Sequence, residues 1–404
     1  MTARGQTVVD FGAVGDGIAD DSAAFQAAIA SGRVIVPPVP ASSRGYMIRS
    51  PLNATNLPAL TIEGSGFSAP IGATAYLVPN GMSTILGGTG GVVLDLAGSN
   101  SVTMRGFNVS SLGVSATPST VGIVGGTSAA TPTGGNAYVF DGVAVCMANV
   151  GVSVPVYLNN ANLCRFPGLW TIGKYGLVLC SHNVLGVTPP YAAWGPIIES
   201  DGNQAGALYL AGYGDGPVLW LEGVNSSAFG ETYTSYAGGA AGKSAFSGAG
   251  YAIRITNCAD VDLKIGCDYF PYVFFMDGVC NKVNISGVTC PDTNQPASGV
   301  PGIGFFGGQA VKNSRFDIIP IGGFAHQPYL YQTYGSAMAS FANCGFLFDT
   351  ATTPNVAAFA MAGGGVPFYN LTFTGNADNP GLSFTPAAPS NMRYSVNGKT
   401  FGIA

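Results

Sequence analysis

Carboxylates and aromatic side chains occur together between residues 194 and 236 of a chain in which only 9% of the residues are charged. The two-residue period of a strand would place Glu199 and Asp201 on one face, about 7 Å apart. Burial of the leucines that flank Trp220 would leave Trp220 and Glu222 outward together. An indole offers a flat apolar face to a sugar ring, and a carboxylate beside it can act as acid, base or nucleophile. This composition predicts a carbohydrate site.

The spacing of these acids suits glycoside hydrolysis. Glu199 and Glu222 lie 23 positions apart, so on adjacent coils of a repeating fold they would stack about 5 Å apart, with Asp201 as a diagonal neighbour. Hydrolysis needs two carboxyls about 5 to 5.5 Å apart for retention or about 6.5 to 9.5 Å apart for inversion, and both are reachable. We therefore predict Glu199, Asp201 and Glu222 as catalytic residues. The predicted substrate-binding residues are Trp194, Tyr209, Trp220, Glu231 and Tyr233. The alternative is that each acid is a solvated surface group.

A second group of charged residues predicts a different reaction. Its members are Arg254, Asp260, Asp262, Lys264 and Asp268, which alternation places on outward positions of neighbouring strands. A polysaccharide lyase needs a cation to neutralise the uronate and a base to take the α-proton, and Arg254 or Lys264 could serve. The competing interpretation is a ladder of ion pairs that braces adjacent coils, with Asp260 opposite Lys282.

Other chemistries lack their residues. The two histidines, His182 and His326, are too isolated for a convincing triad, and neither a phosphate loop nor a zinc-protease motif occurs. We therefore expect no cofactor and no metal. The formal net charge is −5 without a basic run, which argues against nucleic acid as a partner. No apolar stretch is long enough to span a bilayer, and no signal-peptide core follows Met1, so we expect a mature or cytosolically made protein.

Cysteine spacing reveals an internal repeat. Cys258 and Cys280 are 22 positions apart, and aligning the segments that follow them places Val261 over Val283 and Leu263 over Ile285. A period in the low twenties is typical of one coil of a β-solenoid, in which each coil buries its apolar face against its neighbours. No CxxC pair occurs among the eight cysteines, so we predict reduced core residues, with disulfides as the alternative. Cys267 and Cys290 repeat the spacing at 23 positions.

Short alternating runs separated by Gly, Ser, Thr and Pro predict strands along nearly the whole chain. The stretches 125–135 and 235–250 are typical of loops that leave the coils. Near the end, Asn397-Gly398 between two alternating runs predicts a type I′ hairpin. Such an antiparallel ending would cap the open sheet edge or offer strands to partner chains.

One helix is predicted, near the start of the chain. A Gly/Asp-rich turn at residues 9–21 leads into it, with Asp20 or Asp21 as the N-cap and Phe25, Ala28 and Ile29 on one apolar face. A strand at 34–36 follows and stops at two prolines. This segment resembles the N-terminal signature of the pectate-lyase-like superfamily of right-handed parallel β-helices, especially phage tailspikes and capsule depolymerases.

The predicted fold class is all-β, a right-handed parallel β-helix with a short capping helix. We predict a cap at residues 1–35, coils at 36–345, and a C-terminal segment of strands and a hairpin at 346–404 that could serve trimerisation. The resemblance implies a homotrimer on a virion tail or outside the cell, acting on a capsule, O-antigen or exopolysaccharide. Three functions stay open: glycoside hydrolysis, which we favour, β-elimination of an acidic glycan, and binding without catalysis.

Overall fold

The computed structural model describes most of the chain, including nearly all of its strands. The described residues are 6–67, 80–115, 117–126, 137–148, 153–181, 200–212, 216–236, 251–268, 270, 272–290, 303–320, 329–333, 340–348, 357–362, 368–375, 382–385 and 392–403. The chain divides into two compact units, Met1–Tyr213 and Gly214–Ala404. In each unit the strands belong to two sheets, here sheet A and sheet B.

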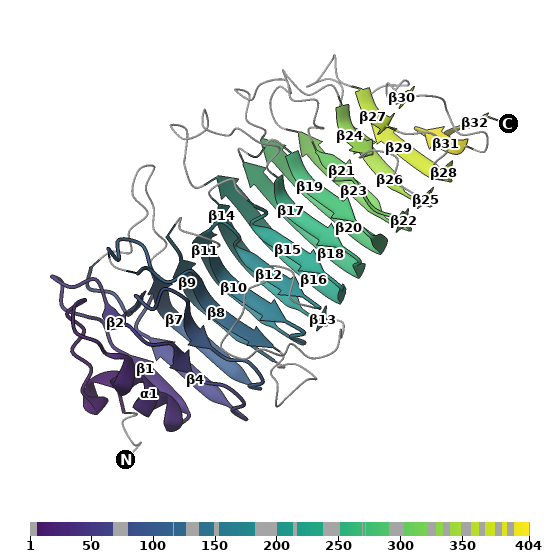
Figure 1. The fold of residues 1–404 in the computed structure, drawn as a ribbon. Coiled ribbons are helices and arrows are strands. Elements are labelled where there is room, and N and C mark those ends of the chain that lie inside the picture. Colours follow the sequence, from purple (N-terminus) through teal and green to yellow (C-terminus); the bar gives the residue numbers. More distant parts are fainter. Residues whose placement is uncertain are drawn as a thin grey trace. The chain divides into compact units, whose positions relative to one another are not determined.

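The first unit begins with two short helices and continues into parallel strands (Figure 1). The helices are η1 (Val8–Phe11) and α1 (Ser22–Ala30). Its sheet A strands are β1 (Arg33–Val36), β2 (Tyr46–Ile48), β4 (Leu60–Gly64), β5 (Thr84–Gly87), β7 (Val102–Ser110), β9 (Val139–Cys146), β11 (Arg165–Gly173), β13 (Ser200–Asp201) and β14 (Gln204–Gly212). Its sheet B strands are β3 (Leu52–Asn53), β6 (Val92–Asp95), β8 (Val121–Gly126), β10 (Val154–Asn159) and β12 (Leu177–Cys180).

The second unit repeats this arrangement. Its sheet A strands are β16 (Val224–Tyr236), β18 (Ala259–Asp268), β20 (Val279–Cys290), β22 (Ala310–Lys312), β23 (Arg315–Pro320), β25 (Ser340–Ala342), β26 (Gly345–Phe348), β28 (Phe368–Tyr369), β29 (Leu371–Gly375), β31 (Met392–Val396) and β32 (Lys399–Ile403). Its sheet B strands are β15 (Leu219–Glu222), β17 (Tyr251–Thr256), β19 (Tyr272–Asp277), β21 (Gly304–Phe306), β24 (Tyr329–Thr333), β27 (Ala357–Ala362) and β30 (Leu382–Thr385).

The chain alternates between the two sheets, and each strand pairs in parallel with the equivalent strand of a neighbouring coil. In sheet A, β18 pairs with β20, and Val261 lies opposite Val283 while Leu263 lies opposite Ile285. This is the register predicted from the cysteine repeat. The fold is therefore a parallel β-helix, as the sequence predicts, because each coil can bury its apolar side chains only on the coil before and after it.

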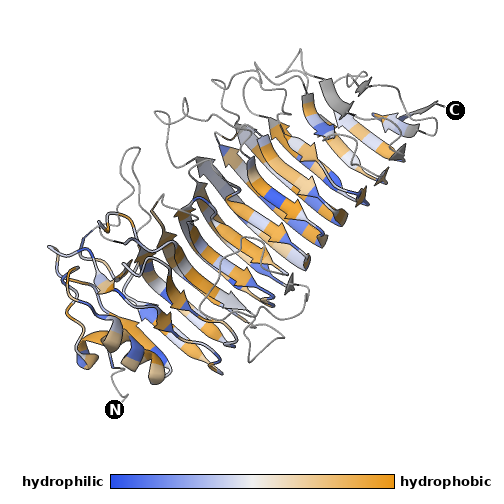
Figure 2. Cartoon of the chain, in the orientation of Figure 1, coloured by the Kyte–Doolittle hydropathy of each residue, from blue (hydrophilic) through white to orange (hydrophobic). Residues whose placement is uncertain are grey.

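Inward positions are mostly apolar, and the alternation of polar and apolar positions along the strands is visible in Figure 2. Phenylalanines form a stack in the second unit, in which Phe274, Phe316, Phe346 and Phe373 follow one another with ring centroids 5.2 to 5.4 Å apart. All seven cysteines whose side chains are described are free and buried. Burial raises the pKa of the Cys146 thiol to about 12, which keeps it protonated.

The N-terminal helix is a lid whose buried residues, Phe25, Ala28 and Ile29, are the ones predicted. Asp21 is the N-cap, but its side chain accepts hydrogen bonds from the backbone N–H groups of Val14 (2.6 Å) and Gly15 (3.2 Å) and not from the helix. Asp21 therefore ties the preceding turn to the start of the helix.

At the other end, β31 and β32 form the predicted antiparallel hairpin. Asn397 and Gly398 occupy its turn with φ of 45° and 82°, as a type I′ turn requires. Parallel pairing continues past residue 345, through β26, β29 and β31, so the coils extend as far as Val396. The hairpin thus follows directly on the last coil.

Candidate functional site

Three neighbouring strands of sheet B in the second unit carry a group of charged and aromatic side chains at positions that alternate with core residues. In β15, β17 and β19, Trp220 lies opposite Arg254, and Arg254 lies opposite Phe275. The next outward row consists of Glu222, Thr256 and Asp277. Alternation produces this arrangement, because the intervening residues, among them Leu221 and Ile255, are buried in the core.

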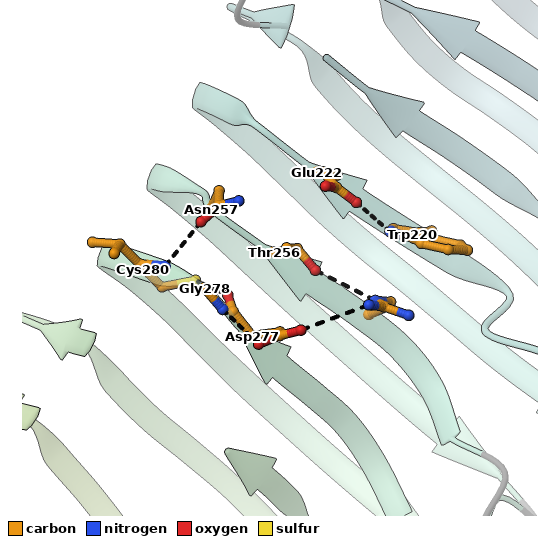
Figure 3. A network of polar contacts seen from close by, with 9 residues as sticks. Trp220, Glu222, Thr256, Asn257, Asp277, Gly278 and Cys280 are labelled. Atoms are coloured by element: carbon orange, nitrogen blue, oxygen red, sulfur yellow. Dashed lines mark hydrogen bonds and ion pairs between the residues drawn. The ribbon is translucent and has the colours of Figure 1, made fainter. Parts of the chain in front are cut away.

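Trp220 and Glu222 project from the same face of β15, as predicted (Figure 3). The indole Nε1–H donates a hydrogen bond of 3.3 Å to Oε2 of Glu222. Neighbouring side chains nevertheless cover both residues, since Trp220 and Glu222 are only 7% and 8% exposed. The guanidinium of Arg254 covers the indole, with its Cζ 4.6 Å from the ring centroid.

Arg254 is the central cation of this face. Besides the indole, its guanidinium lies 5.8 Å from the ring centroid of Phe275, its Nε donates to Oγ1 of Thr256 at 3.4 Å, and its Nη2 lies 3.7 Å from Oδ2 of Asp277. A cation held between aromatic faces and a carboxylate gains from all of these contacts when water is partly excluded. The residue is therefore fixed in place by its neighbours.

Glu222 and Asp277 are the two carboxylates of this face. They occupy one row on strands separated by β17, so their backbones lie roughly 10 Å apart, because neighbouring strands are about 4.8 Å apart. Glu222 is buried beside an indole, whereas the Asp277 side chain is 36% exposed. Asp277 also accepts a hydrogen bond of 2.8 Å from the backbone N–H of Gly278. The two acids thus have different environments.

The structure does not bring all of the predicted site residues to this face. Glu231 and Tyr233 lie on β16, which belongs to sheet A, because the chain turns at Gly223 (φ 62°) between β15 and β16. There Glu231 is exposed and its Oε1 lies 3.9 Å from Nζ of Lys264, while the Tyr233 hydroxyl donates to Asp268. Proximity in sequence was a poor guide here, because a corner of the coil separates the two groups.

Other predicted residues belong to the first unit or lie outside the described residues. Tyr209 lies on β14 and stacks on Trp170 of β11, with ring centroids 4.1 Å apart and an interplanar angle of 25°. Asp201 belongs to β13, but its side chain is not among those described. Glu199 and Trp194 lie outside the described residues.

The second predicted group is divided between the two sheets. Arg254 belongs to sheet B, whereas Asp260, Asp262, Lys264 and Asp268 belong to β18 of sheet A. Asp260 and Lys282 correspond in register, each with φ near 55°, but no ion pair joins them among the described side chains. Instead, Asp262 accepts a hydrogen bond of 2.8 Å from Asn284. Members of the group on β18 therefore contact adjacent coils of sheet A, whereas Arg254 makes its contacts on the sheet B face.

Sequence reasoning did not identify Thr256, Phe275 and Asp277 as part of this face. The sequence did contain a signal for them. Two coils after Trp220 and Glu222, the residues at the equivalent outward positions are Phe275 and Asp277. The coils differ in length between these strands, so the register could not be fixed from spacing alone.

Among the residues that the structure describes, no group of three or more His, Cys, Asp or Glu side chains is placed to hold a metal ion. Within the same residues, none of the helices has the length and apolar character needed to cross a membrane.

Comparison with known proteins defines the fold. No protein-family model matches the sequence, and no curated protein matches it. Among solved structures, lid-free DFA-IIIase from Arthrobacter chlorophenolicus A6 in complex with GF2 is similar with a TM-score of 0.53 and 11% identity, over 97% of this chain and 94% of that chain. The same lid-free enzyme in a second structure gives a TM-score of 0.51 and 12% identity, over 94% and 91% of the chains.

A phage protein, ORF18 of Geobacillus virus E2, is also similar, with a TM-score of 0.39 and 14% identity over 96% of this chain. This chain spans 62% of that protein. At these identities the likeness is one of fold. The chain therefore has a parallel β-helix fold, which its own strand pairing also shows.

Proposed function

We propose that this protein binds and depolymerises a bacterial surface polysaccharide by hydrolysis of glycosidic bonds, at the sheet B face around Trp220 and Glu222. The observation that carries the proposal is the contact between the indole and a buried carboxylate, with a second carboxylate, Asp277, in the same row. An aromatic ring for a sugar and two carboxyls in unlike environments are what glycoside hydrolysis needs.

The two acids differ in the ways that their roles require. Glu222 is the general acid, because it is buried next to Trp220 and can deliver a proton to a leaving oxygen that is shielded from water. Asp277 is the general base, because its more exposed carboxylate can reach a water molecule and its charge is held by Arg254. Their backbone separation of roughly 10 Å suits the wider spacing of an inverting mechanism.

Hydrolysis is favoured over elimination because the two candidate cations, Arg254 and Lys264, already contact carboxylates. A lyase needs a cation free to neutralise a uronate, yet Arg254 is engaged by Asp277, Thr256 and two rings, and Lys264 faces Glu231. The described part of the sheet B face carries one positive and two negative charges, which disfavours an anionic sugar.

The proposal retains the predicted roles of Glu199 and Asp201 as further carboxyl candidates, and those of Trp194, Tyr209, Glu231 and Tyr233 in binding. Because residues 9–38 resemble tailspikes, the proposal includes that the protein is a homotrimer and that it is located on a virion tail or outside the cell.

The experiment is a screen of purified capsule, O-antigen and exopolysaccharide with mass analysis of the products, repeated with Glu222→Gln and Asp277→Asn. Each change keeps the shape of the side chain and removes the acid or base, so turnover should fall a hundredfold or more while folding is retained. Glu199→Gln and Asp201→Asn test the remaining candidates. Asp141→Asn, on β9 of sheet A, is the matched control, because this carboxylate is 44% exposed and lies outside the proposed site, and it should retain full activity.

New reducing ends without near-ultraviolet absorbance support hydrolysis. Products that absorb as 4,5-unsaturated uronates would replace it with a lyase, and loss of activity in Arg254→Ala together with full activity in both carboxylate variants would point the same way. Binding without any product would leave a glycan-binding protein.

A further inference from the structure

A separate groove lies on the outer face of sheet A in the second unit. Its volume is about 510 Å³ and it crosses strands β20, β23, β26 and β29. It is lined by Asn284, Arg315, Asp317, Gly345, Thr372 and Thr374. None of these residues contributes to the sheet B face, and all of their side chains except that of glycine end in polar groups.

The groove exists because a glycine interrupts a row of longer side chains. Along the coils, Asn284 lies opposite Arg315, Arg315 opposite Gly345, and Gly345 opposite Thr372. A Cβ placed on Gly345 would come within 4 Å of a single atom, Cγ of Arg315 at 3.6 Å. The hollow is therefore open space above a strand, and neither close backbone approach nor a positive φ explains this glycine.

One edge of the groove is a ladder of asparagine amides at the corner of the coils. The Nδ2 of Asn313 donates to Oδ1 of Asn281 at 2.8 Å, Asn343 donates to Asn313 at 3.0 Å, and Asn370 donates to Asn343 at 3.1 Å. Each carboxamide has two N–H donors and two acceptor lone pairs, and the ladder uses one of each. Exposed donors and acceptors therefore repeat along this edge at the spacing of the strands.

The charges of the groove cancel. Arg315 and Asp317 form an ion pair with each other through Nε and Oδ2, so no described side chain offers an uncompensated charge to an anion or a cation. The apolar residues that border the groove, Cys344 and Phe346, are 1% and 2% exposed, so a peptide would find no apolar anchor. What remains is a set of planar polar groups and hydroxyls, which match the vicinal hydroxyls of a neutral sugar.

We propose that this groove binds a segment of a neutral, hydroxyl-rich glycan, as a second site independent of the carboxylates on sheet B. The glycan hydroxyls both donate and accept, as do the amides of the ladder and the threonine hydroxyls opposite them. Without an aromatic platform the site is weak alone. Its contribution is to hold a polymer by a second attachment, which multiplies affinity through effective concentration.

The test is affinity electrophoresis of the full chain in native gels that contain inulin, dextran or galactomannan. Gly345→Gln places a longer side chain in the groove through a Cβ that has no backbone atom within 4 Å, and it should weaken retardation by the polymer about tenfold. Gly91→Gln is the matched control, because a Cβ there also has open space around it and lies far along the sequence in the first unit. Its mobility shift should equal that of the wild type.

Two further variants keep the test decisive. Thr372→Val removes a groove hydroxyl with little change of shape, and it should weaken retardation even if Gly345→Gln folds poorly. Asn284→Ala removes a second polar group that lines the groove, and it should weaken retardation in the same direction. Equal retardation of the wild type, Gly345→Gln and Thr372→Val would overturn the proposal, as would the absence of retardation by all three polymers.

Discussion

In the second unit, the outer faces of sheets A and B are built on the same pattern of buried alternate residues but differ in how they meet water. On sheet B, Trp220, Glu222 and Thr256 are each less than a tenth exposed. On sheet A, the outward residues Asp262 and Asn284 are exposed. The inward rows of the two sheets are therefore built alike, whereas their outward rows differ in solvent exposure.

Solvent exposure determines how strongly a charged side chain interacts with its neighbours. An interaction between charges weakens with the effective dielectric constant, so the contacts of Glu222 and Arg254 count for more than the open ion pair between Glu231 and Lys264, which is 82% and 65% exposed. Exposed polar rows instead offer many weak hydrogen bonds. This contrast supports the proposed placement of proton transfer on sheet B and of additional glycan contacts on sheet A.

The largest expected effect separates the inner rows from both outer faces. Leu263 of β18 is buried and lies between Phe229 and Ile285 of the neighbouring coils. Leu263→Asp would bury an unpaired carboxylate there, so we expect no cooperatively folded protein. Lys264→Asp, one residue along the strand on the exposed face, should give normal soluble yield and a thermal melting curve close to that of the wild type.

A cooperative thermal transition in Leu263→Asp would contradict the assigned inner row. The same measurement on Lys264→Asp reports whether the outer face of sheet A tolerates a reversal of charge, as an exposed surface should.

The next effect distinguishes the two outer faces by catalysis. Glu222→Gln on sheet B should lower kcat a hundredfold or more, whereas Asp141→Asn on sheet A should change it less than twofold. Initial rates of reducing-end release measure both. If the two variants lost activity equally, the division of labour between the faces would be wrong.

Much of the fold could be predicted from the sequence because each coil repeats the same physical requirement. The register of Val261 on Val283 follows from two cysteines at equal offsets, and the lid follows from the apolar face that contains Phe25. The Asn397-Gly398 turn is equally local, since a type I′ hairpin depends only on residues that accept positive φ. The asparagine ladder was missed because coils of unequal length hide its period.

The candidate site was only partly predictable, for a topological reason. Alternation correctly joined Trp220 to Glu222, but nearness in sequence also suggested Glu231 and Tyr233, which lie beyond the corner at Gly223 on the other sheet. Asp277 is 55 positions from Glu222 yet occupies the same row. Spacing alone does not reveal where a coil turns, and loops of variable length between strands shift every later register.

A smaller effect concerns binding and compares aromatic residues on the two faces. Trp220→Ala removes the indole that contacts Glu222 and Arg254, and we expect the Kd for the cleaved polysaccharide to rise about tenfold, or about 1.4 kcal/mol. Trp220→Phe keeps an aromatic face and should remain within about threefold. Tyr233→Ala, on sheet A, tests the retained binding role of that residue. A loss as large as that of Trp220→Ala would extend the binding surface around the corner, and an unchanged Kd would confine it to sheet B.

The smallest expected effect is on the pH dependence of stability, and it compares a buried with an exposed carboxylate in the first unit. Asp95 of β6 is 2% exposed, and burial raises its pKa to about 7, although the backbone N–H of Ala97 donates to it at 3.0 Å. In the unfolded chain an aspartate titrates near pH 4, so between about pH 4 and pH 7 the folded protein holds a proton that the unfolded chain has lost. The free energy of unfolding should therefore fall as the pH rises through this window and level off above it.

Denaturant unfolding at a series of pH values measures this slope. Asp95→Asn cannot lose a proton, so it should remove up to one proton's worth of pH dependence and be more stable than the wild type at pH 8. Asp141→Asn is the matched control, because Asp141 is 44% exposed in a surface ion pair with Arg105, an arrangement worth about 0 to 1 kcal/mol. Its pH profile should follow that of the wild type between pH 5 and pH 8. If the unfolding free energy of Asp95→Asn depended on pH as that of the wild type does, water would have to reach this carboxylate. Burial would then not control the charge of a carboxylate in this fold, and the comparison of the two faces would lose its physical basis.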